Sequence, residues 1–303
     1  MEKRKKLAIV GCGALGQACG RAIAATDDLV LAGFVRRPQK VGKKLPKPFR
    51  EIPTAEHISE LGHVDAALVC TPTPTVREIV IGLLQHHIPA VECATLHGED
   101  FVNHKREIDR MADHFETPAI VGAGWDPGAL SLLRNLFAVV TPKGHTETSW
   151  HPGISLHHST VAGNIPGVKK ALTAEFRRPG GAMQRYVYIE VEQEADFEQV
   201  ANAIRNDPLY LTEQTEVFQV DSVEELENEG HGVLLERRGI AAGADRQHLL
   251  LEARYREVAM AAQVMVAAAR ALKRKGHRAY SLFDLPPRAL WGLLADYAEK
   301  QWI

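Results

Sequence analysis

Cysteine is scarce in this sequence, and no two cysteines are spaced as in a zinc site or a disulfide framework. Only four occur in 303 residues, all in the first third of the chain and none in a Cys-x-x-Cys pair: Cys12, Cys19, Cys70 and Cys93. We therefore expect reduced, mostly buried thiols, as is usual in a cytoplasmic protein, and no cysteine-based metal centre.

A long apolar run and an excess of either charge are also missing. No stretch approaches the roughly 18 uninterrupted apolar residues of a transmembrane helix. The apolar run after the basic residues 3–6 is too short for a signal peptide. Lys plus Arg number 36 and Asp plus Glu 38, so the formal net charge is −2. We expect a cytoplasmic protein with no electrostatic reason to bind a membrane or nucleic acid.

What is present in the first 125 residues is an alternation of short apolar runs with helical patterns. Uniformly apolar runs are typical of parallel strands covered on both faces, and their alternation with helices implies right-handed crossovers. The expected fold class is α/β, with a Rossmann-type doubly wound parallel sheet in residues 1–125. Its strands are expected at residues 7–10, 29–35, 66–70, 89–93 and 119–123.

The pattern changes after Asp126. Alternating runs, which predict strands with one polar face, occur at 186–192 and 249–253, and further strand signals occur at 216–220 and 232–237. We expect residues 126–256 to form a second, α+β domain for substrate binding and dimerisation. Residues 257–303 begin with an Ala- and Met-rich helical pattern that is apolar nearly all round, so we expect a buried helix that packs back on the first domain.

The strongest local motif is Gly11-Cys12-Gly13-Ala14-Leu15-Gly16, which follows an expected strand and opens an expected helix. In a dinucleotide fingerprint the first glycine permits a tight turn, and the second lets the backbone approach the pyrophosphate. The third lets helix and strand pack closely, with the phosphates at the helix N-terminus. A dinucleotide site is predicted here, and a glycine-rich turn without a ligand is the alternative.

Two arginines, Arg36 and Arg37, follow the second expected strand. NAD enzymes usually carry an Asp or Glu at this point, which binds the ribose 2′-hydroxyl. Guanidinium groups instead suit a phosphate, to which they donate bidentate, charge-assisted hydrogen bonds. The predicted cofactor is therefore NADP. The alternative is that both arginines are solvated loop residues.

Two further loops follow expected strands, at the sheet edge where ligands bind in such folds. The segment Thr71-Pro72-Thr73 follows the third strand, and it either lines the nicotinamide ribose or only shapes a turn. The motif Gly-Trp-Asp-Pro-Gly at 124–128 ends the fifth strand. Its Asp126 is suited to pair with a substrate ammonium group while Trp125 shields the nicotinamide. The alternative is a boundary turn that Asp126 caps.

Five segments follow one another along the rest of the chain: GWDPG at 124–128, WHPGISLHHS at 150–159, IPGV at 165–168, GHG at 230–232 and AQVM at 262–265. In this order and at these distances they resemble the meso-diaminopimelate D-dehydrogenase family over nearly the whole chain. The shorter substrate domain resembles the compact branch of that family.

The resemblance implies a mechanism and a set of substrate contacts. A hydride leaves the D-centre α-carbon for nicotinamide C4, water attacks the imine, and ammonia is released. Such a reaction depends on positioning more than on acid–base catalysis, because the cofactor carries the chemistry. Trp125 and Asp126 would hold the reacting amino acid end. The carboxylates would be bound by Trp150 with backbone amides near Leu156 and His157, and, at the distal L-centre, by Arg185 and His231.

Four substrate-side residues depart from the family pattern. Where the family shows two aspartates, this chain has Glu92 and Thr95, so one carboxylate near the reacting amine is missing. Glu175 replaces a Thr, and Glu257 stands near an expected Asn. Both glutamates would oppose a distal carboxylate and favour a cation. Another D-amino acid, or a diamine-like compound, is therefore an alternative to diaminopimelate.

Other functions compete with this one. A sugar or polyol dehydrogenase would carry a lysine in the segment after residue 91, and none occurs there. Dihydrodipicolinate reductase shares the fingerprint but lacks the Gly-Trp-Asp-Pro-Gly motif. An NADP-binding sensor without catalysis is a third alternative. The histidines show no metal-ligand spacing, so no metal is expected. The expected partners are a small amino acid or amine and, through the half-polar sheet, a second copy of the chain.

Overall fold

The computed structural model describes residues 4–150, 153–154, 156–177, 183–211, 214–228, 231–272, 276–292 and 295–302. The chain divides into two compact units. The first joins Met1–Asn135 to Glu257–Ile303, and the second is Leu136–Arg256. No helix within the described ranges is long and apolar enough to cross a membrane.

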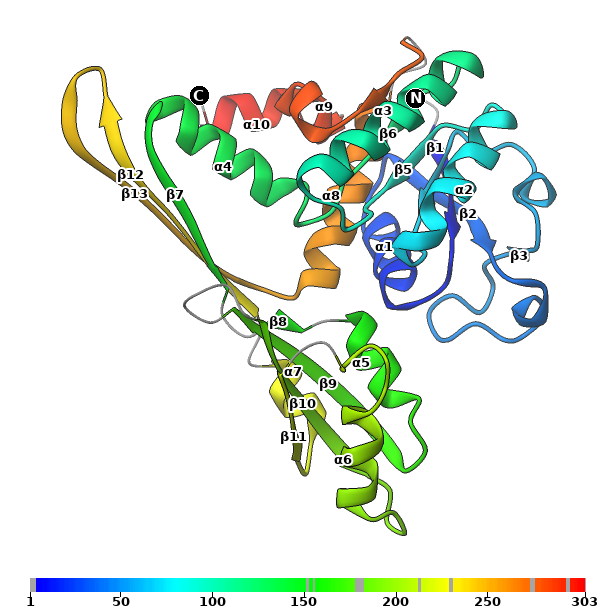
Figure 1. Cartoon of the computed structure of the whole chain (residues 1–303). Coiled ribbons are helices and arrows are strands. Elements are labelled where there is room, and N and C mark those ends of the chain that lie inside the picture. Colours follow the sequence, from blue (N-terminus) through cyan, green and yellow to red (C-terminus); the bar gives the residue numbers. More distant parts are fainter. Residues whose placement is uncertain are drawn as a thin grey trace. The chain divides into compact units, whose positions relative to one another are not determined.

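Seven parallel strands form one sheet in the first unit, which confirms the predicted fold class (Figure 1). They are β1 (Lys5–Val10), β2 (Leu29–Val35), β3 (Thr54–Ala55), β4 (Ala66–Val69), β5 (Ala90–Glu92), β6 (Ala119–Ile120) and β14 (Ala279–Tyr280). Their order across the sheet is β14-β6-β5-β4-β1-β2-β3. The chain therefore proceeds from β1 in one direction to β2 and later in the other to β4, which creates the switch point at which such sheets bind ligands.

Helices cover both faces of this sheet. The helices are α1 (Ala14–Ala24), α2 (Thr73–Gln85), α3 (Gly98–His114) and α8 (Glu257–Ala271). Successive side chains of a strand point to opposite faces. Leu7 and Ile9 accordingly belong to an apolar cluster with residues of α1 and α8, whereas Ala8 belongs to a second cluster with residues of α2 and α3. The sheet is therefore doubly wound.

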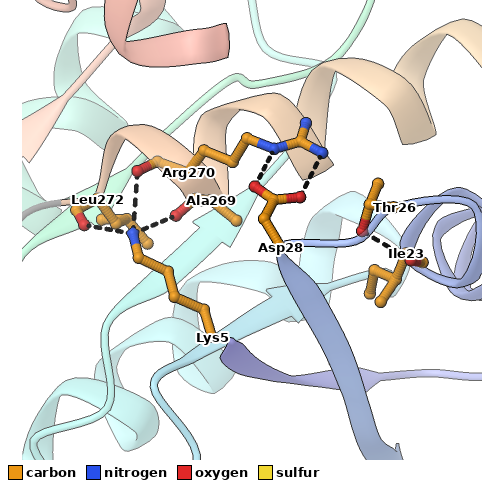
Figure 2. Close-up of polar contacts among 7 residues, drawn as sticks. All are labelled: Lys5, Ile23, Thr26, Asp28, Ala269, Arg270 and Leu272. Carbon is orange, nitrogen blue, oxygen red and sulfur yellow. Dashed lines mark hydrogen bonds and ion pairs between the residues drawn. The ribbon is translucent and has the colours of Figure 1, made fainter. Parts of the chain in front are cut away.

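Helix α8, which follows the second unit in the sequence, is an integral part of the first unit. Its Met265 and Val266 are fully buried in the cluster that contains α1. At its C-terminal end, Lys5 Nζ donates hydrogen bonds to the carbonyl oxygens of Arg270 (2.9 Å) and Leu272 (3.2 Å), as Figure 2 shows. A cation at this end also interacts favourably with the helix dipole. The unit is completed by short helices: η1 (Pro38–Lys40), η2 (Ile58–Leu61), η3 (Leu282–Asp284), α9 (Pro287–Trp291) and α10 (Ala295–Trp302).

The part of the second unit that the structure describes contains two smaller sheets and four helices. The strands are β7 (Lys143–Trp150), β8 (Gly153–Ile154), β9 (Val168–Arg177), β10 (Met183–Val191), β11 (Gln214–Gln219), β12 (His231–Ala241) and β13 (Ala244–Tyr255). One sheet has the order β11-β10-β9-β8 and the other β13-β12-β7. The helices are α4 (Ala129–Val140), which begins in the first unit, α5 (Leu156–Gly163), α6 (Phe197–Arg205) and α7 (Val223–Asn228).

The predicted period-2 alternation is visible in β10. Val187 and Ile189 are fully buried, whereas Tyr186 and Tyr188, which alternate with them, are only partly buried. The buried side chains pack with Val200 and with other apolar residues of α6. The second unit therefore has an α+β core of its own.

Candidate active site

The fingerprint glycines lie where the first strand turns into the first helix, and two of them tolerate no side chain. Gly11 has φ +99°, and a Cβ there would lie 2.5 Å from the carbonyl oxygen of Cys70. A Cβ on Gly16 would lie 2.1 Å from the carbonyl oxygen of Gly11. A Cβ on Gly13, by contrast, would meet no protein atom within 4 Å. The backbone N–H groups at the N-terminus of α1 thus lie in a closely packed turn, the fingerprint cradle, whose shape fits a pyrophosphate.

Arg36 lies beside this cradle. Its backbone N–H donates to Ala55 (2.9 Å), and its Nη1 donates to the carbonyl oxygen of Lys43 (2.8 Å). Burial raises the pKa of the Cys12 thiol in the fingerprint loop, and the positive charge of Arg36 partly offsets this rise. Arg37 is exposed. Both positions fit a phosphate carried by a ribose at the end of β2.

The loop after β4 carries a buried hydroxyl group that the described residues leave unsatisfied. Thr71 Oγ1 is inaccessible to solvent and has no hydrogen-bond partner among the described residues. Such a group is costly unless a partner is supplied. Thr73, where α2 begins after Pro72, accepts a hydrogen bond at Oγ1 from the backbone N–H of Thr95 (3.1 Å). This loop therefore offers a polar group to a nicotinamide cofactor and is tied to the loop after β5.

Asp126 forms a bidentate ion pair with Arg134. The distances are 2.7 Å from Nη1 to Oδ1 and 3.0 Å from Nη2 to Oδ2, and Ser131 Oγ lies 3.3 Å from Oδ1. The side chain of Asp126 is 10% exposed, and Trp125 beside it is buried. Arg134 was not predicted from the sequence, because no known motif joins it to Asp126, eight residues earlier. The guanidinium fixes the orientation of the carboxylate at the carboxyl edge of the sheet.

Thr95 and Glu257 also lie near this edge of the first unit. Thr95 is exposed in the loop after β5. Glu257 begins α8 and is partly buried. Burial raises the pKa of the Cys93 thiol, and the negative charges of Glu92 and Glu257 raise it further. Helix α8, which Glu257 begins, contacts β5 in the same unit.

The remaining predicted residues belong to the second unit. Arg185 of β10 is 6% exposed and lies directly opposite Glu175 of β9 in the antiparallel register. Gly153 of β8 is the partner of Glu175 on the other side. The other four predicted residues lie at the ends of elements: Trp150 ends β7, Leu156 and His157 begin α5, and His231 begins β12. Their side chains, and that of Glu175, lie outside the described part of the structure.

Comparison with known proteins identifies the family. Residues 124–180 match the diaminopimelic acid dehydrogenase C-terminal domain, and residues 5–93 match the NAD-binding Rossmann fold of an oxidoreductase family. A meso-diaminopimelate D-dehydrogenase of Bacteroides fragilis is 35% identical over 284 residues, which are 94% of each chain. This chain belongs to the meso-diaminopimelate D-dehydrogenase family. The predicted resemblance is thereby confirmed.

More distant members of the family agree with this assignment. The meso-diaminopimelate D-dehydrogenase of Acetivibrio thermocellus is 25% identical over 75% of this chain and 73% of its own length. Two solved structures have a TM-score of 0.76 with 99% of this chain and 100% of theirs covered. They are a C. glutamicum diaminopimelate dehydrogenase in complex with diaminopimelate (23% identical) and an engineered D-amino acid dehydrogenase bound to NADP⁺ (24% identical). These two structures establish the fold.

Proposed function

We propose that this enzyme catalyses the NADP-dependent oxidative deamination of an amino-bearing carbon, and the reverse reductive amination. The proposed substrate is the D-centre of meso-diaminopimelate or a related D-amino acid. The observation that carries the proposal is Asp126, held by Arg134 at the carboxyl edge of a dinucleotide-binding sheet, in a family member. We also propose that the enzyme is cytoplasmic, because all four of its cysteines are free thiols.

The first unit would hold the cofactor, which when bound supplies the nicotinamide C4 that accepts a hydride. Gly11, Gly13 and Gly16, with Ala14 and Leu15 between them, would leave room for the pyrophosphate and direct N–H groups at it. The Thr71-Pro72-Thr73 loop would line the nicotinamide ribose, where Thr71 Oγ1 offers a buried hydroxyl. Arg36 and Arg37 would bind the 2′-phosphate and so select NADP over NAD.

Asp126 would bind the ammonium group of the reacting carbon. Two groups act on the carboxylate: Arg134 holds it in place, and the substrate ammonium would approach an oxygen that still has a lone pair. Trp125 would exclude water from the face of the nicotinamide. The ammonium group must lose one proton before the α-hydrogen leaves as a hydride, because only the neutral amine can form the iminium. The hydride step itself depends chiefly on the orientation of the α-hydrogen, since the cofactor carries the chemistry.

The second unit would bind the carboxylate groups. Trp150 and the backbone N–H groups near Leu156 and His157 would contact the carboxylate next to the reacting carbon. Arg185 and His231 would contact the distal one. Glu175 stands in register with Arg185 on the neighbouring strand. Glu175, with Glu257 and Thr95, therefore favours a second candidate substrate: a D-amino acid whose distal end is a cation.

We further propose a homodimer that forms through the three-stranded sheet. Two apolar side chains of this sheet, Ile240 (36% exposed) and Leu250 (57% exposed), are accessible to solvent in the single chain. Burying apolar surface of this kind against a second copy is a common route to a two-fold dimer. The molar mass in dilute solution tests the proposal: a mass of twice 33.4 kDa supports it, and a monomer across the accessible concentration range contradicts it.

The activity is tested by NADP⁺ reduction with meso-diaminopimelate, a panel of D-amino acids, and lysine-like diamines. Turnover of meso-diaminopimelate would make the residues at positions 95, 175 and 257 tolerated variations. Turnover of other amines alone would make Thr95, Glu175 and Glu257 determinants of specificity. If NADPH binds and no amine or keto acid is turned over, the chain is an NADP-binding sensor and not a dehydrogenase.

A further inference from the structure

Glu92, the last residue of β5, is a fully buried carboxylate with three hydrogen-bond donors around it. Oε1 accepts from the backbone N–H of Gly122 (3.0 Å) and from Nε2 of His104 (3.1 Å), while Oε2 accepts from the backbone N–H of Ala94. When His104 carries its proton on Nε2, the two carboxyl oxygens together accept three hydrogen bonds. Burying a carboxyl group is costly unless such bonds are made.

The backbone groups that Glu92 binds belong to two different loops of the site. Ala94 precedes Thr95 in the loop after β5, and Gly122 lies in the loop after β6, three residues before Trp125. The main chain adds a further bond, from the N–H of Ala123 to the carbonyl oxygen of Glu92 (2.7 Å). One side chain thus fixes the separation of two neighbouring loops at the carboxyl edge.

Helix α3 closes this arrangement from the side. His104 is 8% exposed and reaches Glu92 from α3. Phe101, one turn earlier, leaves no room for a side chain at position 122, because a Cβ on Gly122 would lie 2.6 Å from its Cε2. The loop after β6 is therefore held between Glu92 and α3. The loop after β5 is in turn bonded to Thr73 through the N–H of Thr95.

We propose that Glu92 and His104 are positioning residues for the dehydrogenase reaction. Because both side chains are buried, neither contacts substrate or cofactor. They instead place Trp125 and Asp126 relative to Thr95 and to the loop after β4, which carries Thr71 and Thr73. The inference rests on the proposed function, because it assigns the consequence to the hydride-transfer step. Hydride transfer is sensitive to such placement, since a displacement of about 1 Å from a distant mutation can cost about a hundredfold in rate.

Two pairs of variants test this role. Glu92→Gln keeps the size of the side chain but presents an amide NH₂ to a donor, so one of the three bonds is lost. His104→Ala removes the third donor, whereas His104→Gln keeps an N–H at similar reach and is expected to rescue the alanine variant. The matched control is Asp109→Asn: Asp109 lies on the same helix and also accepts a backbone N–H, that of Ala279 (2.8 Å), at the start of β14.

Four quantities are measured on the full-length protein: kcat and KM for the amino acid, Kd for NADPH by fluorescence, and deuterium uptake of peptides covering 93–97 and 121–128. For Glu92→Gln and His104→Ala we expect kcat to fall about ten- to a hundredfold. Both peptides should exchange faster. In Glu92→Gln the N–H groups of Ala94 and Gly122 lose a carboxylate acceptor, and in His104→Ala that carboxylate loses the side chain that holds it in place. The NADPH Kd should stay within about twofold, as should the kcat of His104→Gln and of Asp109→Asn.

A kcat of Glu92→Gln within about twofold of wild type overturns the proposal, as does a fall in kcat with unchanged exchange in both peptides. If Glu92→Gln does not fold, the comparison of His104→Ala with His104→Gln decides by the same criteria. Failure of the proposed function is distinguishable, because it would appear as absence of turnover in the wild-type protein. The exchange measurement then still decides whether Glu92 holds the two loops.

Discussion

The carboxylate of Asp28 accepts two hydrogen bonds from the guanidinium of Arg270, with distances of 2.8 Å from Nε to Oδ2 and 3.1 Å from Nη2 to Oδ1 (Figure 2). Asp28 directly precedes β2, and Arg270 lies in the last turn of α8. Two residues that are 242 positions apart in the chain are therefore joined within the first unit. Together with Lys5, this pair holds helix α8 against the dinucleotide-binding sheet.

Replacing Asp28 by Asn should lower the free energy of unfolding by about 1–2 kcal/mol near neutral pH, because the pair is only partly exposed. The bond from Arg270 lowers the pKa of Asp28 in the folded protein. Its contribution is therefore fully present above the unfolded pKa of about 3.9 and is lost as the pH falls through the lowered folded value. The wild-type advantage, measured by urea denaturation, should shrink below about pH 4.

The matched control for Asp28→Asn is Glu224→Gln, whose pair with Lys170 is exposed on both sides (71% and 51%). It should change stability by less than about 0.5 kcal/mol at either pH. An equal loss in both variants, or a loss for Asp28→Asn that does not depend on pH, would contradict the role assigned to the Asp28–Arg270 pair.

The fingerprint glycines should separate stability from cofactor binding. Gly16→Ala forces a Cβ against the backbone of Gly11, so the variant should lose stability and, with it, cofactor binding. Gly13→Ala meets no protein atom within 4 Å, so its melting temperature without cofactor should match that of wild type. If the pyrophosphate approaches this backbone, its NADPH Kd should still rise about tenfold or more. An unchanged Kd for Gly13→Ala would place the pyrophosphate elsewhere.

The cofactor preference should depend on the two arginines after β2. In Arg36→Ala/Arg37→Ala the KM for NADP⁺ should rise about ten- to a hundredfold, because charge-assisted hydrogen bonds to the 2′-phosphate are lost. The KM for NAD⁺ should hardly change. Arg21→Ala removes an exposed charge from the far end of α1 and serves as the control. An equal rise for both cofactors would show that the arginines do not read the 2′-phosphate.

The Asp126–Arg134 pair should matter for turnover more than for folding. Asp126→Asn is expected to lower kcat/KM for the amino acid about a hundredfold, since the amide loses the attraction for an ammonium group. Arg134→Met leaves the carboxylate without the group that orients it and should lower kcat/KM about tenfold. Arg77→Met, which removes the exposed partner of Glu107, should have almost no effect. Activity of Asp126→Asn close to wild type would remove Asp126 from the site.

Much of the first unit was predictable from sequence, because its strands are short apolar runs and its glycines carry a known spacing. The two-residue strands β3 and β14 were not predicted, since two residues are too few to show a period. In the second unit, β9 reads VKKALTAEFR, and β7 reads KGHTETSW with hardly an apolar residue. Neither sequence predicts a strand by itself, because these segments form strands through the neighbours with which they pair.

The contacts within the site could be predicted only in part. The motif at 124–128 pointed to Asp126, but its partner Arg134 becomes adjacent only after the chain turns into α4. Glu92 carried a signal that was available in the sequence: a charged residue at the end of an otherwise apolar strand requires a buried partner. Which residue supplies it, here His104, depends on how α3 packs on the sheet. The roles of Trp150, Glu175 and His231 stay predictions.

The central claim is tested most directly by mixing the purified protein with NADP⁺ and meso-diaminopimelate and following NADPH absorbance together with ammonia release. The account predicts NADPH and ammonia in equal amounts, no reaction with the L,L-isomer, and a much weaker reaction when NAD⁺ replaces NADP⁺. A protein that binds NADPH tightly but forms neither product, from meso-diaminopimelate or from any D-amino acid, would contradict it.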